Sequence, residues 1–291
     1  MEIRALRYFL ETAKEGNMTR AAKRLFISQP TMSKQLKELE NELGVKLFIR
    51  SNYSIKLTEA GMLLRDRAED ILSLVDKTEA EFKSLEEINS GDIFVGAPES
   101  EAMSLFAEAV HSLQKSYPKI RCNIYSGNLP DVCERLDKGL LDFAIVMSYV
   151  DLSKYNYLPL PAKDTWGILM RKDDPLAGKY TFEVADLKKL PLICSRQWID
   201  QESPKWLGSS AKDMNIIATY NLVYNGSIMV RAGMGYAVVL DKLVNIGDDS
   251  SLIFKPLSGV PQTETYVIWR KDQAFSPLAG LLLQELEKRL E

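Results

Sequence analysis

The sequence has little of the side-chain chemistry on which many enzymes depend. It holds one histidine, His111, and three cysteines, Cys122, Cys133 and Cys194, which lie far apart and form no CxxC pair. A lone histidine without cysteine or carboxylate partners at ligand spacing predicts no metal site and no Ser-His-Asp triad. No P-loop, GxSxG motif or dinucleotide fingerprint is present either. We therefore expect a protein that is not an enzyme and holds no cofactor.

Long hydrophobic runs are also absent. No stretch approaches the roughly 18 apolar residues of a membrane span, and Glu2, Arg4 and Arg7 interrupt the region where a signal peptide would lie. We expect a cytoplasmic protein without membrane contact. The 291 residues, 46% hydrophobic and 26% charged, are enough for two or three globular domains.

The charge is unevenly distributed. The whole chain carries a net charge of −3, but residues 1–60 hold 11 Lys+Arg and 7 Asp+Glu, a balance of +4, so the remainder carries −7. A basic segment at one end of an acidic chain is typical of a nucleic-acid-binding domain joined to a domain of another function. Because the positive balance is modest, a dimer would bind DNA better by doubling the phosphate contacts.

Residues 19–43 carry a helix-turn-helix pattern. Apolar residues recur at helical spacing on two faces: Ala21, Ala22, Leu25, Met32, Leu36, Leu39 and Leu43. Thr19 and Ser28 stand where helix N-caps are expected, Pro30 falls in the first turn of the second helix, and Gly16 can end an earlier helix.

The other face of the second helix is polar, which suits a recognition helix in the DNA major groove. The candidate DNA contacts are Thr19, Gln29, Pro30, Thr31, Ser33, Lys34 and Lys37. Glutamine can pair with adenine, whereas the two lysines would meet phosphates, which position a protein without reading sequence. The alternative is an ordinary solvated face on a three-helix core.

The next residues add a wing. Residues 44–50 and 55–57 are strand-like around a polar turn, and a new helix begins at Thr58. The segments AAKRLFISQPTMSKQLKELENELGVKLFIR and LTEAG resemble the winged helix-turn-helix of LysR-type transcriptional regulators. This resemblance implies a bacterial regulator that binds double-stranded DNA at an interrupted palindrome, with Arg50 contacting DNA from the wing. Tyr53 stands where the family usually has a second basic residue, so this wing brings less charge.

Residues 59–88 predict a long linker helix. Its seam follows the 4-3-4-3 spacing of a coiled coil, with one polar interruption at Thr78: Leu64, Ala68, Ile71, Val75, Thr78, Phe82 and Leu85. The expected partner is a second copy of the helix, which makes a dimer; the alternative is that the helix lies along its own C-terminal domain. The family resemblance favours the dimer and implies further assembly into a tetramer.

From residue 91 to residue 291, strand-like and helix-like segments alternate, which predicts mainly parallel sheets with helices on both faces. We expect an α+β chain: a winged helix-turn-helix (1–58), the linker helix (59–88) and a two-lobed α/β domain resembling periplasmic binding proteins (91–291). Lobe I would span about 91–161 plus 266–291, and lobe II about 162–265. The segments LLDFAIV, KDDPLAGKYTFEVADLKKLPLI and MVRAGMGYAVVL resemble the effector-binding region of the LysR type.

The resemblance implies a small-molecule effector between the lobes. Candidate contacts are polar residues in loops that precede helices or follow strands: Ser100, Ser126, Asn128, Ser148, Ser195, Arg196 and Ser227. They suit an effector with a carboxylate, which Arg196 could pair; each serine or asparagine could equally be only a helix cap. Glu99 and Glu101 would repel a simple anion, which favours an amine on the effector unless they point to solvent.

Two alternatives to an effector-gated regulator remain open in the sequence. One is a ligand-binding α/β protein whose N-terminal helices only oligomerise. The other is a regulator gated by oxidation of Cys122 and Cys133.

Overall fold

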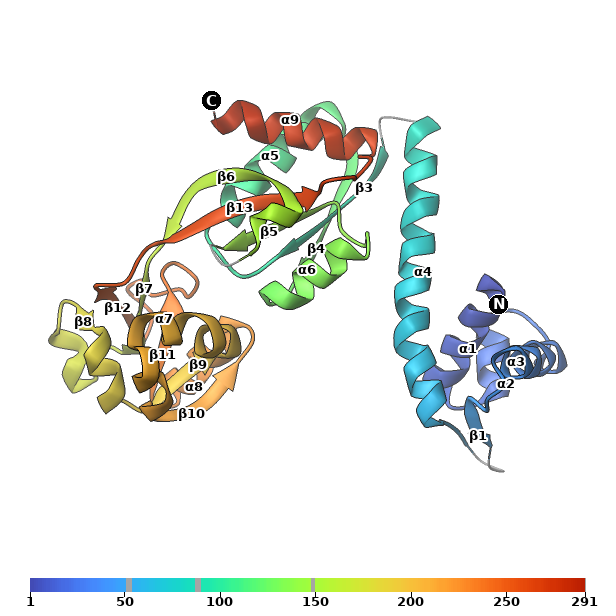
Figure 1. Ribbon diagram of the computed structural model, residues 1–291, viewed down its shortest axis with the longest axis horizontal. Helices are drawn as coiled ribbons and strands as arrows, with labels where there is room; N and C mark the ends of the chain where they lie inside the picture. The colour runs from blue at the N-terminus through green and yellow to red at the C-terminus, as the bar shows by residue number, and fades with distance from the viewer. Residues whose placement is uncertain (51–53, 87–89, 148–149, 291) are drawn as a thin grey trace. The chain divides into compact units, whose positions relative to one another are not determined.

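The computed structural model describes all residues except 51–53, 87–89, 148–149 and 291 (Figure 1). It contains two compact units, Met1–Phe82 and Lys83–Glu291.

The N-terminal unit is a winged helix-turn-helix. Helices α1 (Ile3–Glu15), α2 (Met18–Arg24) and α3 (Gln29–Leu43) precede the antiparallel pair β1 (Phe48–Arg50) and β2 (Ile55–Leu57). The helices enclose a dry core of fully buried side chains: Leu6, Phe9, Ala21, Met32 and Leu36. The predicted helix-turn-helix and wing are confirmed.

The helix boundaries follow local capping chemistry. Gly16, at φ 58°, ends α1, and the Ser28 side chain accepts a hydrogen bond from the backbone N–H of Thr31 at the start of α3. Both were expected. The prediction that Thr19 caps α2 is wrong, because Asn17 does so, accepting from the Arg20 N–H. Asparagine is at least as good a cap as threonine, and Asn17 lies two residues closer than Thr19 to the end of α1.

Helix α4 (Glu59–Glu86) begins after Thr58, whose hydroxyl accepts from the Gly61 N–H at 2.9 Å. In the N-terminal half of α4, the apolar residues of the predicted seam pack against the winged domain and are not available to a second copy of the helix. Ala68 and Leu72 are buried in the core of the winged domain, with Leu64 and Ile71 packed against it. Among the α4 side chains that the structure describes, the large apolar ones left exposed are Met62, Leu63, Leu74 and Phe82. The predicted continuous coiled-coil seam is therefore divided, because its N-terminal half stabilises its own domain.

The C-terminal unit contains two mixed sheets. Lobe I has the strand order β4-β3-β5-β13-β6. Its strands are β3 (Ser90–Ala97), β4 (Lys119–Ser126), β5 (Phe143–Met147), β6 (Tyr155–Asp164) and β13 (Thr263–Arg270). Helices α5 (Met103–Ser116) and α9 (Pro277–Leu290) lie side by side on one face, while α6 (Leu129–Asp137) covers the other (Figure 1).

Lobe II has the strand order β10-β9-β11-β7-β12-β8. Its strands are β7 (Trp166–Arg171), β8 (Phe182–Glu183), β9 (Leu192–Ser195), β10 (Ile216–Tyr220), β11 (Tyr236–Leu240) and β12 (Leu252–Ser258). Helix α8 (Val223–Arg231) packs on one face. The other carries short helical turns and α7: Pro175–Gly178, Val184–Lys189, Trp198–Glu202, α7 (Ser203–Leu207) and Gly208–Asp213.

The two-lobed α/β architecture is as predicted, but the sheets are mixed rather than mainly parallel. In lobe I, β3 runs parallel to β4 and β5, whereas β13 runs antiparallel to β5 and β6. The returning strand β13 causes this, because it enters lobe I from lobe II and pairs in the opposite direction. Helix α8 begins at Val223, so Ser227 lies inside this helix and not in a loop before it, as the sequence had suggested.

The chain crosses between the lobes twice, and the two crossing segments meet at one buried aspartate, Asp164. Asp164, fully buried at the end of β6, pairs with Thr263 at the start of β13. Its carboxylate accepts a hydrogen bond from the Ser100 hydroxyl at 2.8 Å. Burial, with a contribution from Asp241, raises the pKa of the Asp164 carboxyl despite this hydrogen bond.

In the N-terminal unit, Glu40 ties α3 to the wing. Although Glu40 is only 3% exposed, its carboxylate accepts from the Leu47 N–H at 2.9 Å and lies 3.1 Å from the Lys46 ammonium. Burial alone would raise the pKa of Glu40, but the N–H groups of Leu47 and Phe48 and the Lys46 charge outweigh burial and lower it.

We predict that Glu40→Gln weakens the attachment of the wing to α3 by about 1–3 kcal/mol at pH 7, because a charge-assisted hydrogen bond is lost. The pKa of Glu40 is lowered in the folded state, so its stabilisation is present above the unfolded pKa and is lost as the pH falls through the folded one. Faster amide hydrogen exchange in peptides covering Leu47 and Phe48 would report the loss. The effect should shrink below about pH 4.

The matched control is Glu38→Gln on the same helix, since the Glu38 side chain is 54% exposed. Equal exchange in both variants at pH 7 would contradict the assigned role of Glu40.

Candidate functional site

The N-terminal turn of α3 presents polar groups to solvent. Six of the predicted DNA contacts are exposed, and Ser33 is half-buried: Thr19, Gln29, Pro30, Thr31, Lys34 and Lys37 are the exposed six. Ser28 holds the helix start, its hydroxyl lying 2.8 Å from that of Thr31. Arg50 belongs to β1, but its side chain and all of Tyr53 lie outside the described residues.

Two of these polar side chains, Gln29 and Lys34, have only weak contacts within the protein. The Gln29 amide donates to the Met18 sulfur at 3.3 Å, and the Lys34 ammonium lies 3.9 Å from the Glu38 carboxylate. A sulfur acceptor is weak, and exposed ion pairs contribute little to stability. Both groups can therefore turn toward another partner at small cost.

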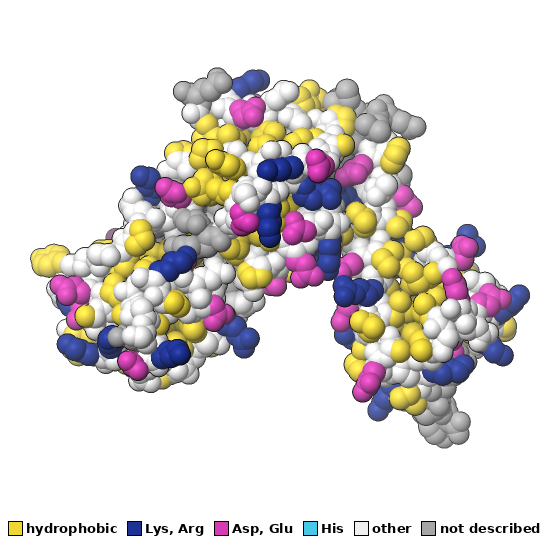
Figure 2. Space-filling model, in the orientation of Figure 1, with side chains coloured by type: hydrophobic (Ala, Val, Ile, Leu, Met, Phe, Trp, Pro, Cys, Tyr) yellow, Lys and Arg dark blue, Asp and Glu magenta, His cyan; other side chains and the backbone are white. Residues whose placement is uncertain are grey.

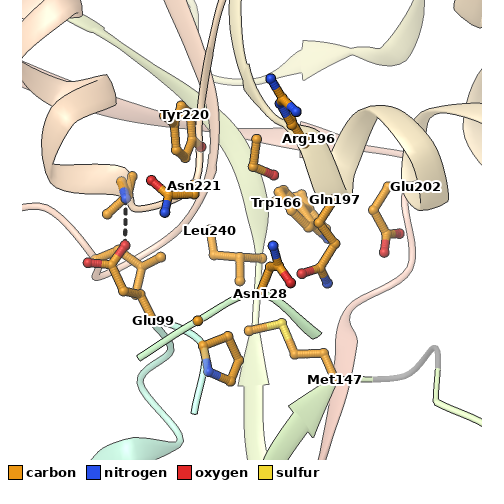
Figure 3. Close-up of a pocket in the computed structure, with 15 residues that line it drawn as sticks. Glu99, Asn128, Met147, Trp166, Arg196, Gln197, Glu202, Tyr220, Asn221 and Leu240 are labelled. Carbon is orange, nitrogen blue, oxygen red and sulfur yellow. Dashed lines mark hydrogen bonds between the residues drawn. The ribbon is translucent and has the colours of Figure 1, made fainter. Parts of the chain in front are cut away.

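A pocket lies between the two lobes of the C-terminal unit (Figure 3). Its cavity volume is about 110 Å³. Most of the lining residues lie at or just after the carboxyl ends of strands from both sheets, where α/β domains usually bind ligands, whereas Trp166 begins β7. The lining residues are Pro98, Glu99, Gly127, Asn128, Met147, Trp166, Ser195, Arg196, Gln197, Glu202, Tyr220, Asn221, Val223, Leu240 and Leu243.

Three of the predicted effector contacts line this pocket: Asn128, Ser195 and Arg196. The first two act as caps in the structure. The Asn128 side chain accepts from the Asp131 N–H at 3.1 Å, and the Ser195 hydroxyl accepts from the Trp198 N–H at 3.1 Å. Arg196 is exposed, and Figure 3 shows its guanidinium pointing away from the other labelled side chains.

Three other predicted contacts lie elsewhere, and these predictions are not supported by the geometry. Ser100 is buried against Asp164 at the lobe crossing. Ser227 lies inside α8, where its hydroxyl donates to the Tyr224 carbonyl at 2.7 Å, because that helix starts earlier than expected. Ser126 is exposed at the end of β4 and does not line the pocket. Ser148 lies outside the described residues.

Two hydrogen bonds join the lobes at the pocket, and in both a side-chain oxygen meets a helix N-terminus of the opposite lobe. Glu99, after β3 of lobe I, accepts from the Val223 N–H of α8 at 2.5 Å (Figure 3). Gln197, after β9 of lobe II, accepts from the Leu129 N–H of α6 at 3.4 Å. The glutamate bond is short and charge-assisted, so it is the stronger one.

Sequence reasoning missed several lining residues. Tyr220 and Asn221 follow β10, a strand that was not predicted, and Glu202 lies in a short π-helical turn. The Tyr220 hydroxyl donates to the Val238 carbonyl at 2.8 Å, and burial, with smaller contributions from Cys194 and Glu99, raises the pKa of Tyr220. Glu202 is buried, 1% exposed. Gln197 lies in the loop 195–197, which the family resemblance placed at the pocket, but it was not named as a candidate contact.

Neither a metal site nor a membrane span is found in the part of the chain that the structure describes. No three His, Cys, Asp or Glu side chains there are grouped closely enough to bind a metal ion. None of the helices there combines the length and apolar character needed to cross a bilayer.

Comparison with known proteins covers the whole chain. Residues 3–62 match the family model of the bacterial regulatory helix-turn-helix protein, lysR family, and residues 87–291 match that of the LysR substrate binding domain. The chain is 30% identical to the HTH-type transcriptional regulator YtlI of Bacillus subtilis, across 99% of this chain and 89% of that protein. It is 29% identical to the HTH-type transcriptional regulator BudR of Raoultella terrigena, across 93% and 95%.

Solved structures share the fold. CbnR, a LysR family transcriptional regulator, aligns with a TM-score of 0.78 over all of both chains at 20% identity. Full-length CbnR complexed with its target DNA aligns with a TM-score of 0.76 over 99% of both chains at 21% identity. Because its two domains match the two family models in order and together span nearly the whole sequence, the chain belongs to the LysR family of transcriptional regulators.

Proposed function

We propose that this regulator binds a specific DNA duplex through the N-terminal turn of α3 and that a small molecule in the pocket between the lobes controls the binding. The observation that carries the proposal is the exposed polar face at the start of α3, held on a buried core by the Ser28 cap. The match to the helix-turn-helix family model supports it. The function is regulatory rather than enzymatic, and a DNA-binding role requires a cytoplasmic location in a bacterium.

The proposed DNA contacts divide by chemistry. Gln29, Thr31 and Ser33 can read base edges in the major groove, while Lys34 and Lys37 meet phosphates. Thr19 and Pro30 lie against the backbone of the duplex, and Arg50 and Tyr53 extend the contact from the wing. CbnR has been crystallised with its target DNA, and its similar fold supports the use of the same element here.

The regulator acts as a dimer in this proposal. Apolar side chains exposed on the described part of α4, Met62, Leu63, Leu74 and Phe82, offer a surface for a second copy, and Figure 2 shows hydrophobic side chains gathered on the N-terminal unit where α1 and α4 lie. Two copies would present two recognition helices to two half-sites, which makes an interrupted palindrome the expected target. Assembly into a tetramer through the C-terminal domain, and the domain limits 1–58, 59–88 and 91–291, belong to the same proposal.

Selection of bound sequences from a random duplex library by the full-length protein, at about 0.15 M salt, tests the proposal, because moderate salt suppresses nonspecific binding. We expect enrichment of an interrupted palindrome. No enrichment, with and without added metabolites, would contradict it.

We predict that Gln29→Ala and Lys34→Ala weaken DNA binding in different ways. Gln29→Ala should lose about 1–3 kcal/mol at one base pair of each half-site and relax the preference there. Lys34→Ala should weaken binding to all sequences alike and reduce the salt dependence by about one charge per protomer. Titrations of the selected duplex and of point-substituted duplexes at several salt concentrations measure both effects.

Two controls match these variants in chemistry. Gln35→Ala changes a glutamine of α3 whose amide donates to Glu38, and Lys188→Ala removes an exposed lysine of lobe II. Equal losses on specific and random DNA for Gln29→Ala would contradict its assigned role.

A gate based on cysteine oxidation is disfavoured by the surroundings of the thiols. Burial raises the pKa of Cys122 and of Cys133 to about 11, and that of Cys194 to about 12. The thiolate is the form that reacts with peroxide, and at pH 7 a thiol with a pKa of about 11 is ionised in about one molecule in ten thousand.

We therefore predict that iodoacetamide modifies Cys122 and Cys133 of the folded protein more than about 100-fold more slowly than free cysteine at pH 7. Their rates should rise about tenfold per pH unit up to pH 10, since the thiolate fraction does so. Mass spectrometry of the labelled peptides gives the rates, and protein unfolded in urea is the control. Fast labelling at pH 7, or DNA binding that responds to peroxide only while both cysteines are present, would restore the redox hypothesis.

A further inference from the structure

The carboxylate at the centre of the pocket lining is that of Glu99, and the carboxyl group of Glu202 lies buried in the same lining. Among the lining residues that the structure describes, Arg196 alone is a lysine or arginine, and its exposed guanidinium points away from the others (Figure 3). A ligand in this cavity therefore meets the Glu99 carboxylate rather than a cation.

The positions that would favour an anion already hold oxygen atoms of the protein. The N-terminus of α8 is capped by the Glu99 carboxylate at 2.5 Å. The N-terminus of α6 is capped by Asn128, and its Leu129 N–H is directed at Gln197. An anionic ligand would have to displace Glu99 from α8, which breaks the hydrogen bond to Val223. It would then lie beside the displaced carboxylate, and the two negative charges would repel each other.

The walls are also suited to a positively charged group. Trp166 and Tyr220 contribute aromatic rings, which attract cations through their electron-rich faces. The amide oxygens of Asn128, Gln197 and Asn221 can accept hydrogen bonds from N–H donors. Met147, Leu240 and Leu243 supply apolar surface for the remainder of a small molecule.

We propose that the effector of this regulator is a small organic cation, an amine, amidine or guanidine, whose positive group pairs with Glu99. This inference rests on the proposed function, since it names the class of ligand for the same pocket. The cavity of about 110 Å³ is small, so the effector is a compact molecule whose positive group enters the pocket. It replaces the expectation, drawn from the sequence, of a carboxylate paired with Arg196.

Pairing of the ligand with Glu99 would also change how the two lobes are held together. Glu99 belongs to lobe I and Val223 to lobe II, so the bond between them holds the lobes together at the pocket. A cation that draws the Glu99 carboxylate toward itself weakens that bond and frees the first N–H of α8. Ligand charge is thereby coupled to the contact between the lobes.

Three probes of one shape and different charge test the proposal on the full-length protein: benzamidine (cation), benzamide (neutral) and benzoate (anion). Binding is followed by isothermal titration and by tryptophan fluorescence, for which Trp166 in the pocket is a reporter. We expect saturable binding of benzamidine below about 10 mM, at least about tenfold tighter than that of benzamide, and no binding of benzoate in that range.

Glu99→Gln keeps an oxygen that can accept the Val223 N–H but removes the charge. We expect it to bind benzamidine and benzamide equally. Glu101→Gln, an exposed glutamate two residues away, is the matched control and should keep the tenfold preference. Amide hydrogen exchange in a peptide covering Val223 should speed up when benzamidine binds the unchanged protein.

Binding of benzoate as tight as that of benzamidine, absence of benzamidine binding, or an unchanged preference in Glu99→Gln would each overturn the proposal. Sequence-specific DNA binding is measured on the same preparations. A failure of the charge preference in protein that still selects its palindrome therefore leaves the regulator function standing, whereas loss of selective DNA binding contradicts that function instead.

Discussion

The N–H groups at the start of a helix have no partner within the helix, and how this chain satisfies them decides the character of both units. In the N-terminal unit the caps are local: Asn17 serves α2, Ser28 serves α3 and Thr58 serves α4. Local caps let the small domain fix the start of α3 and leave the side chains that follow it exposed. In the C-terminal unit two helix N-termini also receive a side chain from the other lobe, since Glu99 reaches the start of α8 and Gln197 the start of α6.

That difference explains why the pocket and the lobe arrangement depend on each other. The lobes are joined covalently at two crossings, where Asp164 pairs with Thr263 and bonds to Ser100, and non-covalently at the pocket by Glu99. Ser100 immediately follows Glu99, so the pocket carboxylate and the crossing are held by adjacent residues of one loop. A displacement of Glu99 is therefore transmitted directly to the loop that contacts the crossing.

The sequence predicted features that depend on neighbouring residues and failed where the partner is distant. Ser28 and Asn128 were recognised as helix starts because a cap lies within three residues of the N–H that it serves. The start of α8 was misplaced because its cap, Glu99, lies 124 residues away, and Ser227 was then taken for a pocket residue. Strand β6 was missed because Pro159 and Pro161 interrupt its pattern, which is tolerated since β6 is an edge strand paired only with β13.

The linker helix shows the same limit of sequence patterns. The spacing of its apolar residues predicted a helix with an apolar stripe, but spacing alone does not say which partner covers each residue. Ala68 and Leu72 pack into the core of the winged domain, because a domain this small needs apolar residues from α4 to enclose its core.

The free energy expected for the Glu99–Val223 hydrogen bond suits a regulatory role. A hydrogen bond to a charged group contributes about 1.5–3 kcal/mol, and coupling between two sites in allosteric proteins amounts to about 1–3 kcal/mol. One such bond, made in one arrangement of the lobes and weakened in another, is enough to change DNA affinity by roughly one to two orders of magnitude if the coupling is fully transmitted. A ligand shifts that equilibrium only by its difference in affinity for the two arrangements. A ligand that competes for the Glu99 carboxylate binds well only where the bond to Val223 has been released. Its affinity therefore differs between the two arrangements of the lobes.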